Sequence, residues 1–139
     1  MAVDPNDYYQ ISKDSNFIQC PLNTGGDIEC NPADKLNDQV WFVGSDPQNT
    51  TLQCTIQNNG SPVWMVAEAK DGGNVTSTSN QSEATQFCIH DDGGIELLPA
   101  SGDDKYFLYQ SGAKVKVQKT IKQTWTWNKT KLGSSGHIG

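Results

Sequence analysis

The chain has 139 residues, which is enough for one domain with one modest core. Apolar residues make up 35% of it, and no apolar run approaches the roughly 20 residues that span a bilayer, so we expect no membrane partner. The net charge is -6, but residues 1–104 hold all 16 acids and three lysines, whereas residues 105–139 hold seven lysines and no acid. Because Arg, the preferred residue for bidentate phosphate and base contacts, is absent from the sequence, we also expect no nucleic-acid partner.

Short runs with β-branched or aromatic residues, each bounded by Gly, Pro, Asn or Asp, predict strands along the whole chain. Clusters such as Asn23–Gly26, Asp71–Gly73 and Asp92–Gly94 supply turn residues that tolerate positive φ. In chain order, the predicted strands are 8–12, 17–20, 27–30, 39–43, 52–57, 63–67, 75–78, 85–89, 95–98, 106–110, 114–118 and 123–127.

An apolar segment with an aromatic anchor recurs three times, at Trp41, Phe87 and Trp125. The anchors lie 46 and 38 residues apart, and four predicted strands belong to each interval, which is the size of one β-trefoil unit. We therefore predict an all-β fold, a β-trefoil of twelve strands in three pseudo-repeats, as a single domain over residues 1–131. Residues 132–139 are expected to form a flexible tail. An immunoglobulin-like sandwich is the alternative architecture.

Three such units bury their inward faces only when they share one core. The large residues expected there are Phe17, Trp41, Trp64, Phe87, Phe107 and Trp125. Trp127 is left open as a core or surface residue.

The four cysteines are Cys20, Cys30, Cys54 and Cys88. They lack the Cys-x-x-Cys spacing of zinc sites, and no secretory signal precedes them, so we expect reduced, buried thiols in a cytoplasmic protein. A mature secreted form is the alternative.

The sequence offers no catalytic constellation. His90 and His137 are the two histidines, and Cys88, His90 and Asp91 look more like a strand end and turn than a nucleophile site. We expect neither an enzyme nor a metal or cofactor site. For the lysines of residues 105–131, an intramolecular role against the acidic part of the chain is favoured over a patch for an acidic partner.

Two anchors follow a Gln-x-Trp pattern, Gln39-Val-Trp41 and Gln123-Thr-Trp125, and the middle repeat departs with Thr85-Gln-Phe87. Over residues 8–127 this pattern resembles two groups of β-trefoils, the ricin-B-type lectins and the small fungal protease inhibitors of the mycocypin and cocaprin type.

The preferred implication is a monomeric defence protein that inhibits proteases reversibly through its surface loops. Resemblance to mycocypins points to Asn58 or Asn59, beside Gly60, for the cysteine protease legumain; an ordinary Asn-Gly hairpin turn is the alternative there. Papain-like proteases would meet first-repeat loops, either Lys13, Asp14, Ser15 and Asn16, which lack the family's Gly, or Asn31, Pro32 and Ala33. The loops for aspartic proteases are not assigned.

A ricin-B-like lectin is the alternative function. Its sugar sites need an early Asp, an Asn before the Gln-x-Trp and an aromatic platform, for which Trp64 and Tyr109 are the candidates. Asp38, Ala84 and Lys122 stand where that Asn belongs. A third class, a growth-factor-like trefoil, would bind an acidic glycan through its lysines.

Overall fold

The computed structural model describes residues 3–21, 25–55, 62–98 and 103–133, and these ranges are built of strands and turns. The helical segments within them are two short 3-10 turns, η1 (Asn37–Gln39) and η2 (Gln81–Glu83). The prediction of an all-β chain is therefore confirmed. The strands are β1 (Asp7–Lys13), β2 (Asn16–Gln19), β3 (Glu29–Pro32), β4 (Trp41–Val43), β5 (Leu52–Cys54), β6 (Val63–Ala67), β7 (Val75–Thr78), β8 (Gln86–Ile89), β9 (Ile95–Leu98), β10 (Tyr106–Ser111), β11 (Lys114–Lys119) and β12 (Thr126–Thr130).

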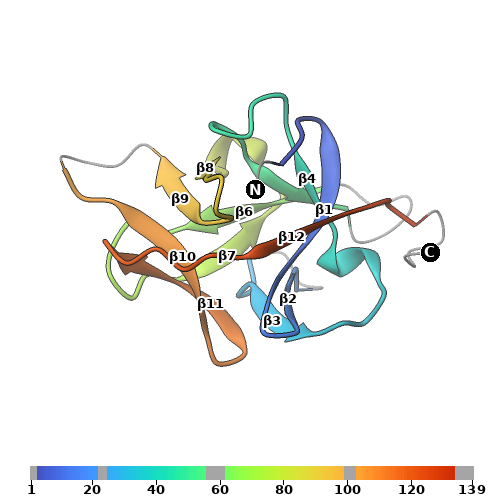
Figure 1. Cartoon of the computed structure of the whole chain (residues 1–139), viewed down its shortest axis with the longest axis horizontal. Coiled ribbons are helices and arrows are strands. Elements are labelled where there is room, and N and C mark those ends of the chain that lie inside the picture. The colour runs from blue at the N-terminus through green and yellow to red at the C-terminus, as the bar shows by residue number, and fades with distance from the viewer. Residues whose placement is uncertain (1–2, 22–24, 56–61, 99–102, 134–139) are drawn as a thin grey trace.

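The strands form one antiparallel sheet that curls on itself (Figure 1). Its order is β7-β6-β5-β4-β1-β2-β3-β11-β10-β9-β8, and β12 pairs with β1. That last pairing runs from Tyr8 opposite Thr130 to Ser12 opposite Thr126, so it joins the beginning of the described chain to its end. Thr50, just before β5, and Phe87 in β8 exchange two backbone hydrogen bonds. These bonds join two segments that lie far apart in the strand order.

Three hairpins, β2–β3, β6–β7 and β10–β11, extend from this curled sheet. Each hairpin touches the other two through short antiparallel bridges. These bridges pair Asp27 with Thr76, Asn74 with Lys116 and Lys114 with Glu29. The three hairpins therefore form a closed ring of contacts.

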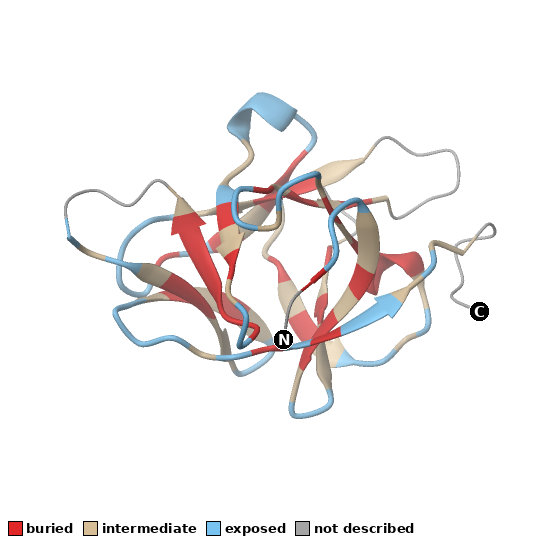
Figure 2. Cartoon of the chain, turned by 45° about the horizontal axis from the view of Figure 1, so that its top comes forward, coloured by how far each residue is buried: buried red, intermediate tan, exposed pale blue. Residues whose placement is uncertain are grey.

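The three aromatic anchors lie inside the curled sheet: Trp41 and Phe87 are fully buried and Trp125 is nearly so. Figure 2 shows that burial follows the strands and that exposed residues gather in the turns. The indole nitrogen of Trp41 donates to the carbonyl oxygen of Ile18 (2.9 Å), and that of Trp125 donates to Leu108 (3.2 Å). The indoles of these two anchors are thereby hydrogen-bonded to the hairpins that precede them in the chain.

Further positions repeat the pattern of the anchors. Ile18 in β2, Met65 in β6 and Leu108 in β10 are fully buried. Two residues beyond each anchor, where a strand points to the same face again, Val43, Ile89 and Trp127 are also buried. Trp127 is thus a core residue.

The core prediction was wrong at Phe17, which is half-buried. Phe17 precedes Ile18 in β2, and because neighbouring strand residues point to opposite faces, the burial of Ile18 turns Phe17 outward. Trp64 and Phe107 are buried as expected, but both lie outside the main apolar cluster.

The strand predicted over 39–43 begins later, at Trp41, because Asn37–Gln39 form the η1 turn. These three polar residues are buried, and the side chains of Asn37 and Gln39 hydrogen-bond to neighbouring segments of the chain. The Asn37 amide exchanges two bonds with the backbone of Gly133 (2.8 and 2.9 Å), which fixes the last described residue of the chain. The last predicted strand also begins later, at Thr126, because the Trp125 backbone N–H bonds Gly93 in the β8–β9 turn.

No helix within the described ranges is long and apolar enough to cross a bilayer.

Two glycines with positive φ give a matched test of this packing. Gly93 (φ +93°) lies against the backbone of Trp125, where an added Cβ would overlap the carbonyl oxygen, whereas Gly112 (φ +62°) has open space around it. We expect Gly112→Ala to cost about 1 kcal/mol of unfolding free energy through backbone strain alone. Gly93→Ala should cost about 3 kcal/mol or more, since it adds a clash in the closed core. Urea unfolding of both variants measures this difference, and equal losses would contradict the packing of the β8–β9 turn on the Trp125 backbone.

Candidate functional site

The predicted loop Lys13–Asn16 is the tight turn between β1 and β2. Lys13 pairs with Asn16 across the two strands, so the loop itself is Asp14 and Ser15. Both residues have positive φ (50° and 67°), as a two-residue type I′ hairpin turn requires. The turn exposes Asp14 and Ser15 but offers no extended stretch of backbone.

The predicted segment Asn31–Ala33 lies at the end of β3. The Asn31 amide donates to Gln19 (3.3 Å) and Glu29 (3.4 Å), so this residue is held in the sheet. Pro32 and Ala33 are exposed beyond it. Asn58, Asn59 and Gly60 lie outside the described residues.

Next to Ala33, the carboxyl groups of Asp34 and Asp38 lie side by side. Asp38 is 5% exposed, and its Oδ1 atom is one of the buried polar atoms without a hydrogen-bond partner in the described chain. Burial, and then the neighbouring Asp34, raise the pKa of Asp38 to about 7. At neutral pH this acid therefore holds a proton for part of the time.

The pKa of Asp38 makes the stability of the fold pH-dependent. Between about pH 4 and pH 7 the folded chain keeps a proton that the unfolded chain has lost, so this group's contribution to stability falls as the pH rises. We expect Asp38→Asn to remove that fall and to leave the variant about 1–3 kcal/mol more stable than the wild type above pH 7, because the buried charge is gone. Urea unfolding from pH 5 to 8 measures it, with the exposed Asp14→Asn as control; an unchanged pH slope in Asp38→Asn would contradict the assignment.

The Gln-x-Trp residues themselves have internal roles. The Gln39 amide donates to Gln19 (3.0 Å) and to the carbonyl oxygen of Pro32 (2.9 Å) and accepts the Asp34 N–H (3.1 Å). The Gln123 side chain accepts the N–H of Gln110 (3.2 Å). The motif thus ties each anchor to neighbouring segments of the fold.

The two candidate platforms for a sugar differ in exposure. Trp64 is only 8% exposed and cannot offer its ring face to a sugar. Tyr109 in β10 is half-buried.

Five of the seven C-terminal lysines form ion pairs with acids of the first 104 residues. The hydrogen bond to Lys114 (2.8 Å) lowers the pKa of Asp27, and the same bond raises the pKa of Lys114. Lys129 bonds Asp4 and Asp7, and these two carboxylates raise its pKa. The intramolecular interpretation of the lysines is thereby confirmed at these five positions, which are Lys105, Lys114, Lys119, Lys122 and Lys129.

A loop that was not predicted as a site connects β11 to β12. Ile121 is 66% exposed and is the exposed large hydrophobic residue of the described chain. Thr120 before it has a φ of 73°, which is strained for a β-branched residue. We call residues 120–125 the Ile121 loop. The signal in the sequence is a lone apolar residue in a polar connection, between Thr120 and Lys122.

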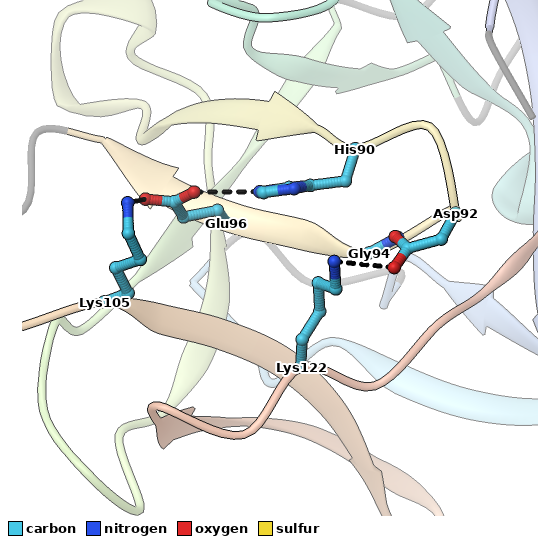
Figure 3. A network of polar contacts seen from close by, with 6 residues as sticks. All are labelled: His90, Asp92, Gly94, Glu96, Lys105 and Lys122. Atoms are coloured by element: carbon cyan, nitrogen blue, oxygen red, sulfur yellow. Dashed lines mark hydrogen bonds and ion pairs between the residues drawn. The ribbon is translucent and has the colours of Figure 1, made fainter.

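The Ile121 loop is held at several points. The Thr120 N–H bonds the carbonyl oxygen of Lys105 (2.7 Å), and the Ile121 N–H bonds that of Lys119 (2.8 Å). Lys122 reaches Asp92 in the β8–β9 turn (2.6 Å) and lowers the pKa of that carboxyl group (Figure 3). At its end, Trp125 is anchored in the core. The backbone that presents Ile121 is therefore fixed on both sides.

A second group of polar residues lies on the outer face of the β8–β9 hairpin. Cys88 in β8 is directly opposite Glu96 in β9, and His90 follows two residues after Cys88 on the same face. The His90 Nε2 atom lies 2.8 Å from Glu96 Oε1, and Lys105 approaches Glu96 Oε2 at 3.4 Å, as Figure 3 shows. The side chain of Glu96 is 7% exposed and that of His90 is 30% exposed.

Cys88, His90 and Glu96 form the group of possible metal ligands found in the described residues, and their ligand atoms lie within 4.8 Å of one another. All four cysteines are free thiols; Cys20, Cys30 and Cys54 are buried as predicted, but Cys88 is only half-buried, which corrects the prediction for that residue. Glu96 carries no sequence signal of its own. Pairing the predicted strands 85–89 and 95–98 across the Asp92–Gly94 turn would place it near Cys88.

Comparisons of the chain with protein-family models, with curated proteins and with solved structures gave no match.

Proposed function

We propose that the curled sheet is a β-trefoil. The closed ring of three hairpins and the equivalent buried positions, such as Ile18, Met65 and Leu108, support this architecture. In a β-trefoil the remaining six strands form the barrel, which agrees with the pairings of β1 with β4 and β12, β4 with β5, and β8 with β9.

We further propose that the protein is a reversible, non-covalent protease inhibitor that acts through a surface loop. The observation that carries this proposal is the Ile121 loop, in which one exposed aliphatic side chain stands on a strained and anchored backbone. An inhibitory loop must enter a cleft without losing much conformational freedom, because ordering on binding costs affinity. Strained backbone of this kind is common at sites of interaction.

The chemistry of Ile121 suits a protease cleft with an apolar subsite, such as those of papain-like cysteine proteases and pepsin-like aspartic proteases. Moving an isoleucine side chain from water into such a subsite is worth about 1.5–3 kcal/mol, or roughly 10- to 150-fold in affinity. The loop with Asn58 and Asn59 stays a separate proposal for legumain, whose specificity is for Asn.

A panel of papain, pepsin and legumain tests this function. We expect inhibition of papain or pepsin, and Ile121→Asp should raise the inhibition constant by about 10-fold or more, because a carboxylate is poorly accommodated in an apolar subsite. Ser79→Asp is the matched control, since it adds the same charge to an exposed turn after β7 and should leave inhibition unchanged. Asn59→Ala should affect legumain alone.

Two results would contradict the proposal. Equal inhibition by the wild type and Ile121→Asp would remove the Ile121 loop from the interface. Absence of inhibition across the panel, together with binding on a glycan array, would favour a lectin instead.

A further inference from the structure

We infer that Cys88, His90 and Glu96 form a binding site for one divalent transition-metal ion, for which Zn²⁺ is the best match. This inference is separate from the proposed inhibition and rests on the outer face of the β8–β9 hairpin. This site was missed in the sequence because the Cys-x-x-Cys spacing detects only ligands that are close along one segment. Here the third ligand, Glu96, comes from the neighbouring strand.

The donor set fits zinc chemically. A thiolate sulfur, an imidazole nitrogen and a carboxylate oxygen are all ordinary zinc ligands, and a mixed set of this kind does not suit Mg²⁺ or Ca²⁺. With three protein ligands, the tetrahedral ion would keep its fourth position for a water molecule.

The hairpin holds the three groups close to the required spacing. With zinc bonds of about 2.0–2.3 Å, ligand atoms in a tetrahedral site are about 3.3–3.8 Å apart. All three ligand atoms lie within 4.8 Å of one another, and the 2.8 Å contact between His90 and Glu96 must open slightly. Shortening the longer separations and lengthening the His90–Glu96 contact both need about 1 Å or less. Rotation of the side chains supplies such shifts without movement of the paired strands.

The backbone of the hairpin is already fixed. The His90 N–H bonds the carbonyl oxygen of Gly94 (2.8 Å), and the Gly93 N–H bonds that of His90 (2.9 Å). The His90 ring also packs against Phe107, with ring centroids 5.7 Å apart. Metal binding would therefore require little ordering of the chain.

The negative charge at the site comes from Glu96, a carboxylate on the outer face of the hairpin whose side chain is 7% exposed. The Cys88 thiol proton would leave to solvent as the sulfur–metal bond forms. Lys105 competes for Glu96, but its side chain is 64% exposed and free to turn toward water.

Titration of the full chain with ZnCl₂, after reduction of the thiols and removal of metal by a chelator, tests the site. Isothermal calorimetry should show one ion per chain. Cys88→Ser, His90→Ala and Glu96→Gln should each weaken binding about 10-fold or more. The matched control is His137→Ala, which removes the other histidine of the chain and should bind like the wild type.

Two further measurements separate loss of ligands from loss of fold. Co²⁺ should give a sulfur-to-metal charge-transfer band that disappears in Cys88→Ser and persists in His137→Ala. Lys105→Met should bind Zn²⁺ several-fold more tightly, a gain that misfolding cannot produce, because the competing ammonium is removed. No saturable binding, a charge-transfer band that survives in Cys88→Ser, or no gain in Lys105→Met would each overturn the inference.

Discussion

The closed core depends on how the anchor tryptophans are buried. A buried indole N–H usually finds an acceptor, and those of Trp41 and Trp125 find theirs on the strands β2 and β10. These bonds tie Trp41 in β4 to the β2–β3 hairpin and Trp125, just before β12, to the β10–β11 hairpin, so neither part can shift without leaving a buried polar group unpaired. At the middle position Phe87 has no such donor, and the Met65 carbonyl oxygen accepts the backbone N–H of Thr85 instead (3.1 Å). The departure from Gln-x-Trp in that repeat is thus compensated by the backbone.

Short runs with β-branched or aromatic residues, bounded by turn residues, were sufficient to predict most strands. The predicted strands 63–67, 75–78 and 95–98 have the observed bounds. Predictions failed where side chains replace backbone pairing, as at Asn37 to Gln39, because burial of polar residues depends on distant partners such as Gly133. The candidate sites were harder still. Ile121 became a candidate because its loop exposes it, and Glu96 because the strand register places it opposite Cys88. Neither the exposure of a loop nor the register of a neighbouring strand can be read from the local sequence.

Both surface features described for this chain rest on the β8–β9 hairpin. Its turn receives Lys122 of the Ile121 loop and the Trp125 backbone, and its outer face carries Cys88, His90 and Glu96. The rigid strands supply the support, and the connections supply the side chains that partners can reach. Five of the seven C-terminal lysines likewise form ion pairs within the chain.

Hydrogen exchange of the indole N–H groups tests the closed core most directly. In ¹⁵N spectra, with each signal assigned by a Trp→Phe variant, the indoles of Trp41 and Trp125 should exchange together and only as fast as the whole chain unfolds. Exchange of one of them much faster than global unfolding, or independently of the other, would contradict a single core that holds both anchors.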